Sequence, residues 1–289
     1  MANPGGVEYR YSSINTLDPV ADGIRAALSE EFDRTGFVVR RGLFTGGEIA
    51  AIRERFDRLA AAARAVPGYW EPDLSAAAGE DPLRRYPRVM MPHRWDALSK
   101  GMLLDVRVHE VLAALWGEEP VAAQSMYYFK PPGARGQALH QDNFYLQVKP
   151  GTCLAAWTAI DPSTPENGGL YVVPGTHDLA LACPEMADER DSFVTHLVRV
   201  PTGRKAVPVP LAPGDTLFFN GSLIHGSAPN RSADRWRRAF IGHYIPRSAQ
   251  FVSKFYFPLV DFQGREVSFQ PSTDGGPCGS EFQAPAYGA

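Results

Sequence analysis

The 289-residue sequence has few of the features that assign a protein early to a compartment or a partner. It has three widely spaced cysteines, Cys153, Cys183 and Cys278, and no CxxC pair, which argues against a zinc knuckle or a dithiol redox site. No apolar run approaches the roughly 18 residues that a membrane-spanning helix needs. Residues 1–15 lack the basic segment and apolar core of a signal peptide. We therefore expect a reduced, cytoplasmic protein without a membrane partner.

The sequence also has no strong excess of positive or negative charge. The net charge is −3 and no long run of like charges occurs, so nothing indicates a nucleic acid or an anionic membrane as partner. The content of 44% hydrophobic and 21% charged residues is ordinary for a globular protein that builds its own core. Five lysines against 24 arginines, with much alanine and glycine, hint at a GC-rich bacterial genome.

One short stretch, Leu139-His140-Gln141-Asp142-Asn143, carries the first chemical signal. On an extended segment, His140 and Asp142 would point to the same side, because strand side chains alternate. A surface histidine beside a turn aspartate would give the same triplet. A second histidine, His225, follows an apolar run and enters a Gly/Ser turn. Two histidines and one carboxylate form the facial triad that holds Fe(II) and leaves open positions.

Twelve residues after His225, Arg237 opens the strand-like run 237–244. The planar fork of an arginine binds a carboxylate through two parallel hydrogen bonds, so Arg237 suits an enzyme with a dicarboxylate co-substrate. Alternation puts Arg237 and Ile241 on one face of the strand and Arg238 on the other, where we expect a solvent-facing charge. His243 shares the Arg237 face, and we expect it to be a core histidine.

Taken together, these four residues resemble the phytanoyl-CoA dioxygenase family of Fe(II)/2-oxoglutarate oxygenases. The resemblance runs from about residue 124 to 244, with further matching stretches in the family's order at 126–133, 156–160, 166–170 and 173–177.

The resemblance implies that His140, Asp142 and His225 bind Fe(II), and that 2-oxoglutarate chelates the iron while its far carboxylate pairs with Arg237. It also implies a co-substrate pocket that includes the residues Met126 and Trp157. Tyr128 lies on the same strand face as Met126, so we expect its hydroxyl to donate to a carboxylate of the co-substrate. The implied reaction consumes O2, releases succinate and CO2, and hydroxylates, desaturates or cyclises a small molecule at an unactivated C–H bond. Related halogenases have a small residue in place of Asp142, so the carboxylate argues against halogenation.

The substrate is less defined by the sequence. Met91 and His93 lie in a loop that mixes aromatic, basic and thioether groups, and Gln141, Asn143 and Phe144 adjoin the ligands, so we take all five as candidate substrate contacts. We prefer a bacterial secondary-metabolite intermediate or a modified amino acid as substrate. An acyl-CoA or fatty-acid hydroxylase of the same family, a zinc hydrolase and a cupin-like binding module stay open as alternatives, and so does the oligomeric state.

Periodicity predicts a mainly β protein with flanking helices. Apolar steps of four predict a helix over 18–34, and Thr45 with Glu48 forms a capping box before a second helix with Ala63 on its buried face. A short helix is expected at about 106–116. Strands are predicted at 37–40, from 122 to 130, and at 137–142, 152–161, 169–173, 206–210, 215–219 and 237–245.

Short strands without long intervening helices indicate an antiparallel double sheet, which the resemblance sharpens to a double-stranded β-helix, a cupin-like jelly roll. We expect one Fe(II)/2-oxoglutarate dioxygenase domain over 1–289. Its predicted parts are N-terminal helices at about 17–65, an irregular loop at 66–100, a jelly-roll core at about 120–246 with an insertion at 178–205, and a Gly/Pro-rich tail at about 265–289.

Overall fold

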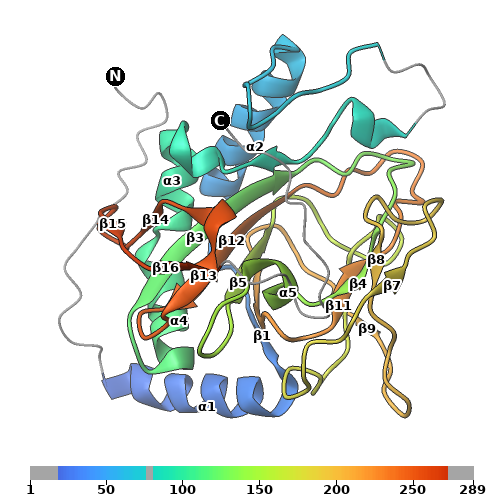
Figure 1. Ribbon diagram of the computed structural model, residues 1–289. Helices are drawn as coiled ribbons and strands as arrows, with labels where there is room; N and C mark the ends of the chain where they lie inside the picture. Colours follow the sequence, from blue (N-terminus) through green and yellow to red (C-terminus); the bar gives the residue numbers. More distant parts are fainter. Residues whose placement is uncertain (1–18, 76–80, 273–289) are drawn as a thin grey trace.

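A computed structural model describes residues 19–75 and 81–272 (Figure 1). The expectations for residues 1–16, for part of the 66–100 loop and for most of the C-terminal tail lie outside these ranges. Within them, no helix is long and apolar enough to cross a membrane. Cys153 is a buried free thiol, whereas Cys183 is disulfide-bonded, so the expectation of fully reduced cysteines is wrong.

Two antiparallel sheets form the body of the molecule. The larger sheet has the order β1 (Phe37–Arg40), β10 (Thr216–Asn220), β5 (Leu154–Ala159), β12 (Ala239–Pro246), β3 (Pro120–Tyr128), β14 (Leu259–Val260) and β15 (Glu266–Val267), with β2 (Val89–Met90) also paired to β3. The smaller sheet has the order β4 (Gln137–His140), β11 (His225–Ser227), β6 (Leu170–Val172) and β9 (Val207–Pro208). Two further pairs are β7 (Glu185–Met186) with β8 (His196–Leu197) and β13 (Phe251–Ser253) with β16 (Gln270–Ser272). The predicted mainly β, double-sheet fold class is confirmed.

The helices are α1 (Pro19–Thr35), α2 (Gly46–Ala62), α3 (Ala97–Leu103), α4 (Val106–Trp116) and the one-turn α5 (Asn143–Leu146), with short 3-10 turns η1 (Pro82–Arg84), η2 (Pro92–Arg94) and η3 (Lys254–Tyr256). Helix α2 begins at the predicted capping box. The Thr45 hydroxyl accepts a hydrogen bond from the Glu48 backbone amide, and the Glu48 carboxylate accepts one from the Thr45 backbone amide. Ala63, predicted on the buried face, instead ends this helix in a left-handed conformation.

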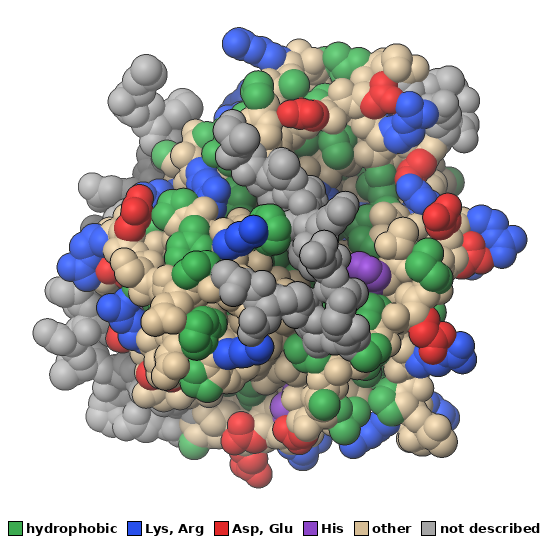
Figure 2. All heavy atoms as spheres, in the orientation of Figure 1, with side chains coloured by type: hydrophobic (Ala, Val, Ile, Leu, Met, Phe, Trp, Pro, Cys, Tyr) green, Lys and Arg blue, Asp and Glu red, His purple; other side chains and the backbone are tan. Residues whose placement is uncertain are grey.

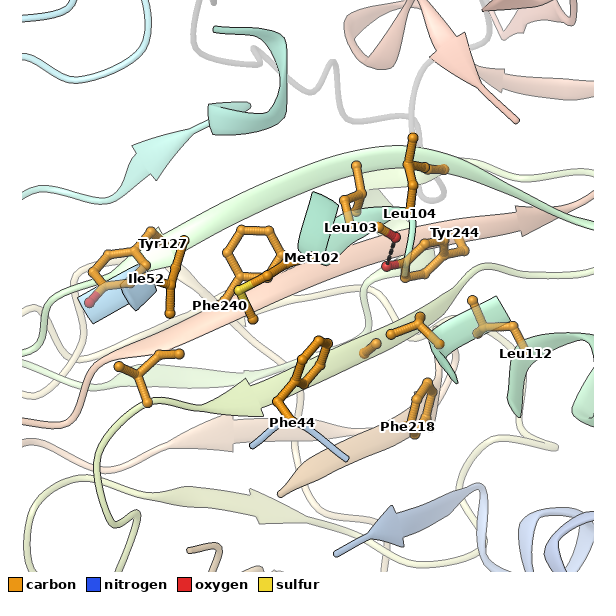
Figure 3. Packing of buried hydrophobic residues seen from close by; sticks show 14 of the residues in the cluster. Phe44, Ile52, Met102, Leu103, Leu104, Leu112, Tyr127, Phe218, Phe240 and Tyr244 are labelled. Carbon is orange, nitrogen blue, oxygen red and sulfur yellow. Dashed lines mark hydrogen bonds between the residues drawn. The ribbon is translucent and has the colours of Figure 1, made fainter. Parts of the chain in front are cut away.

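The main apolar core lies between the helices α1 to α4 and one face of the larger sheet. Tyr127 of β3 and Phe240 of β12 pair across the strands and pack against Ile52 and Met102 of the helices (Figure 3). The ring of Phe56 stacks on that of Tyr127 at 4.0 Å between centroids. Burial of apolar surface stabilises a fold by roughly 25 cal/mol per Å², so this layer anchors the larger sheet.

A second apolar cluster lies between the two sheets. Met126, Trp157 and Ile241 of the larger sheet face Leu170 and Val172 of the smaller one. These residues alternate along β3 and β12 with those of the main core, as the period of two requires. The open end of this space between the sheets holds the site described next.

Four predicted segments differ in detail. Strand β4 ends at His140, and the chain enters α5 at Asp142, so the strand expected over 137–142 is shorter. His225 lies in a strand, β11, where a turn was expected. The irregular loop 66–100 contains β2, η2 and the start of α3, and the insertion 178–205 contains β7 and β8.

On the face shown in Figure 2, acidic and basic side chains are interspersed among apolar ones, and the coloured atoms show no large area of one sign.

Candidate metal centre

Three elements bring the predicted metal ligands together. His225 of β11 is the direct cross-strand partner of His140 at the end of β4, and Asp142 follows at the start of α5. The two imidazole rings lie 4.2 Å apart between centroids. Each of the three residues offers one ligand atom within 4.8 Å of the other two, and all three side chains are buried.

A close backbone contact keeps the two histidine strands in register. A Cβ at Gly226 would lie 2.8 Å from the carbonyl oxygen of Gln137 in β4. Any side chain at this position would push β11 away from β4, beside the point where His225 and His140 pair.

Hydrogen bonds set the protonation of both imidazoles. Nδ1 of His140 lies 2.8 Å from the Ala138 carbonyl oxygen, and Nδ1 of His225 lies 3.0 Å from that of Leu223. Since a carbonyl only accepts, each Nδ1 carries the proton and each Nε2 presents a lone pair. These Nε2 atoms lie 3.3 Å and 3.7 Å from oxygens of Asp142. Two cis ligands each ~2.1 Å from one ion would be about 3 Å apart, so the donor set fits a divalent metal.

Electrostatics hold these groups in their metal-binding forms. Burial alone would raise the pKa of Asp142, but His225 and His243, with the hydrogen bond from His243, hold that pKa well below its usual value. Burial lowers the pKa of His225 to about 4, although the Asp142 carboxylate opposes the shift. At neutral pH the carboxylate is ionised and His225 is neutral, as metal ligation requires.

The three residues open into a cavity of about 330 Å³ between the sheets. Its lining includes the side chains predicted to contact a co-substrate: Met126, Tyr128, Trp157 and Arg237.

Arg237 is the most unusual of these side chains. It is 2% exposed, donates through Nε to the Gly168 carbonyl at 3.0 Å, and lies 5.2 Å from the centroid of the Trp157 ring. Burial lowers its pKa to about 10, so the guanidinium is still charged at neutral pH. No carboxylate of the described residues forms a salt bridge with Arg237. A buried charge without an acidic partner among these residues is costly, so an anion bound in the cavity beside Arg237 would be stabilised.

The neighbouring Arg238, just before β12, does not line the cavity. It pairs with Asp161 at 2.7 Å and with Asp57 at 2.6 Å, and its side chain is 15% exposed. The expectation of a solvent-facing charge at this position is therefore wrong, because the acidic residues of two other segments enclose it.

The five candidate substrate contacts lie elsewhere: none is among the residues that line the cavity. Met91 is fully buried in a third apolar cluster, and the His93 ring bonds to the Ser125 hydroxyl at 2.7 Å. The Gln141 side chain donates a hydrogen bond to the Ser222 carbonyl, and the Asn143 side-chain oxygen accepts one from the Val148 amide. Both side chains therefore bind backbone groups. Phe144 packs against the ring of His196.

Other residues line the cavity beyond the five candidates. They are Arg88 and Met90 of the same loop stretch, Tyr145 in α5, Phe193 and His196 in the insertion, and His243 in β12. The guanidinium of Arg88 lies 4.9 Å from the Phe193 ring and donates to the Tyr128 hydroxyl at 3.3 Å. Tyr145 follows Asp142 by three residues, the spacing of one helical face, but that signal is hidden when the segment is taken as a strand.

Comparisons with known proteins agree with this architecture. The phytanoyl-CoA dioxygenase (PhyH) family matches residues 32–239, and the chain belongs to this family. Phytanoyl-CoA dioxygenase 1 of Oryza sativa subsp. japonica is 33% identical over 141 residues, which are 48% of this chain and 50% of the rice protein. The chain thus spans about half the length of this curated relative.

Two solved structures share the fold. EvdO2 from Micromonospora carbonacea var. aurantiaca, complexed with 2-oxoglutarate, has a TM-score of 0.59 and 25% identity, covering 81% of this chain and 93% of its own. The α-ketoglutarate-dependent epimerase SnoN from nogalamycin biosynthesis has a TM-score of 0.61 and 23% identity, covering 80% and 85%.

Proposed function

We propose that this protein is a single-domain Fe(II)- and 2-oxoglutarate-dependent oxygenase. It would use O2 to convert 2-oxoglutarate to succinate and CO2 while it hydroxylates, desaturates or cyclises a small molecule at an unactivated C–H bond. The observation that carries the proposal is a buried guanidinium, Arg237, which has no acidic partner among residues 19–75 and 81–272 and lies in the same cavity as the His140, Asp142 and His225 cluster.

In this proposal His140, Asp142 and His225 hold the iron, which when bound supplies the redox chemistry with dioxygen. Arg237 receives the far carboxylate of 2-oxoglutarate through two parallel hydrogen bonds. The Trp157 ring under the guanidinium fixes its orientation. Tyr128, whose hydroxyl already contacts Arg88, adds a donor to the same carboxylate.

The walls of the cavity serve to exclude water. Met126, Trp157, Leu170, Phe219 and Ile241 surround the polar groups with apolar surface. In such a setting electrostatic contacts are stronger than in water, and side reactions of a reactive oxidant are suppressed. A carboxylate at position 142 favours hydroxylation, desaturation or ring closure over halogenation.

A zinc hydrolase is the rival occupant of a two-histidine, one-carboxylate set. It would have no use for the buried cation at Arg237, and neither would a binding module that holds only a metal. For the substrate we propose a bacterial secondary-metabolite intermediate or a modified amino acid. An acyl-CoA is the second candidate, because the rice relative bears the name phytanoyl-CoA dioxygenase 1.

The test is uncoupled turnover. Metal-free protein is supplied with Fe(II), 2-oxoglutarate and oxygen, and succinate is measured with and without a panel of amino-acid derivatives, polyketide glycosides and acyl-CoA thioesters. Without a candidate substrate, we expect slow succinate formation from Fe(II), 2-oxoglutarate and oxygen. A compound of the correct substrate class should speed succinate formation and should be converted to a product heavier by one oxygen or lighter by two hydrogens. Absence of succinate with Fe(II), together with ester or amide hydrolysis on zinc loading, would favour the hydrolase.

A further inference from the structure

A third imidazole touches the carboxylate of the candidate metal centre. Nε2 of His243, in β12, lies 3.0 Å from Oδ2 of Asp142, and both side chains are buried. His243 does not belong to the group whose ligand atoms all lie within 4.8 Å of one another. It therefore contacts the ligand Asp142 without sharing the position that the other two histidines converge on.

The hydrogen bonds of His243 differ from those of the other two imidazoles. In His140 and His225, the protonated Nδ1 donates a hydrogen bond to a backbone carbonyl, and Nε2 is left as an acceptor. Nδ1 of His243 is buried and has no hydrogen-bond partner in the described part of the chain. Because an ionised carboxylate only accepts, Nε2 of His243 must carry the proton that it gives to Asp142.

The elements that carry the two residues differ in rigidity. Asp142 stands at the start of the one-turn α5, and its side chain makes no cap hydrogen bond there. His243 lies in the middle of the larger sheet, paired with Ala155 of β5 and with Gln124 of β3. The hydrogen bond thus ties a carboxylate on a short turn to a strand that is held on both sides.

We propose that His243 is a positioning residue that makes Asp142 bind the metal through one oxygen only. By donating to Oδ2, which lies 3.7 Å from Nε2 of His225, it leaves Oδ1, which lies 3.3 Å from Nε2 of His140, for the ion. Without this bond the carboxylate can turn and place both oxygens on the ion, or swing away from it. The inference rests on the proposed metal centre and adds a second layer to it.

The test measures metal binding and needs no substrate. Co(II) is titrated into metal-free protein, and the visible absorption of the bound ion reports both the affinity and the coordination geometry. In His243→Leu we expect the Kd for Co(II) to rise about 10- to 100-fold, the usual cost of losing a partner of a metal ligand, and the spectrum to change. His243→Gln keeps an N–H donor on a side chain of similar reach, so its Kd and spectrum should stay close to those of the unmodified protein.

His109 supplies the matched control. It too is buried, with Nε2 2.8 Å from the Glu119 carboxylate and Nδ1 without a partner among the described residues, but it lies in α4 and does not line the cavity. His109→Leu should bind Co(II) like the unmodified protein, and thermal melts of each variant establish that it is folded.

The outcomes separate the two proposals. If the unmodified protein binds neither Co(II) nor Fe(II), the metal centre itself is wrong, and this inference falls with it. If the unmodified protein binds Co(II) and folded His243→Leu has the same Kd and spectrum, only the role of His243 is overturned. A change in His243→Gln as large as in His243→Leu would also overturn it, because that result indicates a direct ligand. Should His243→Leu not fold, His243→Ala takes its place in the same titration, with the same expected loss of Co(II) affinity.

Discussion

The two faces of strands β3 and β12 have opposite characters. On the face toward the helices, Tyr127 and Phe240 are packed in an apolar layer. On the face toward the smaller sheet, β12 carries His243, whose buried Nδ1 has no hydrogen-bond partner in the described structure, and the buried Arg237 lies just before this strand. Alternating side chains thus let one pair of strands supply stability on one side and a ligand-ready cavity on the other.

The largest effect is expected from removing a proposed metal ligand on the cavity side, which tests whether this face binds the metal without stabilising the fold. His225→Ala should abolish Fe(II) binding and uncoupled succinate formation, because two of three ligands do not hold the ion. Its melting temperature without metal should stay near that of the unmodified protein, since the ring lies outside the main core. Metal analysis after desalting and a thermal melt give both values; retained iron would remove His225 from the ligand set.

The reverse experiment acts on the helix side. Phe240→Ala should lower the free energy of unfolding by about 3–5 kcal/mol, the usual cost of deleting a buried phenylalanine. Its folded fraction at low temperature should still bind Fe(II), because the ring points away from the cavity. Urea unfolding with parallel metal titration checks this. A loss of metal affinity without loss of stability would show that the two faces are not separable.

The adjacent residues Arg237 and Arg238 allow the same comparison between a role in co-substrate binding and a role in stability. Arg237→Ala should raise the KM for 2-oxoglutarate by roughly 10- to 100-fold, because hydrogen bonds to a charged group are worth about 1.5–3 kcal/mol. Arg238→Ala removes the ion pairs with Asp161 and Asp57 and should lower stability while it leaves that KM nearly unchanged. Equal KM effects for the two variants would mean that the co-substrate arginine is wrongly chosen.

The fold class and the family could be predicted because both depend on local patterns. Alternation, capping and the order of short motifs are readable along the chain, and they brought together His140, Asp142, His225 and Arg237 as candidates. The backbone at Asp142 was predicted as strand, since the helical turn that begins there is only four residues long. One turn is too short to show a helical period.

The cavity wall could not be predicted in the same way. Which side chains of loop 66–100 and of the insertion face the site depends on how these segments pack, and β2 brings Arg88 and Met90 to the cavity in place of Met91 and His93. His243 was assigned to the correct face by alternation. Its contact with Asp142 joins residues 101 positions apart and has no local signal.

The smallest effect concerns acid stability on the helix side. Burial lowers the pKa of His93 to about 3, from an ordinary value of 6.5. The unfolded chain therefore binds a proton between pH 6.5 and 3 that the folded chain refuses, so stability falls as the pH drops through this window, by up to about 1.4 kcal/mol per unit. His93→Gln should show a shallower loss in urea titrations between pH 7 and 4.5; an unchanged slope would contradict the assignment.

The central claim is that His140, Asp142, His225 and Arg237 form one site for ferrous iron and 2-oxoglutarate. Its most direct test is the visible absorption of the protein mixed with Fe(II) and 2-oxoglutarate without oxygen. We predict a weak charge-transfer band in the unmodified protein and in Arg238→Ala, and none in His225→Ala. A band that persists in His225→Ala, or its absence from the unmodified protein at saturating iron, would contradict the claim.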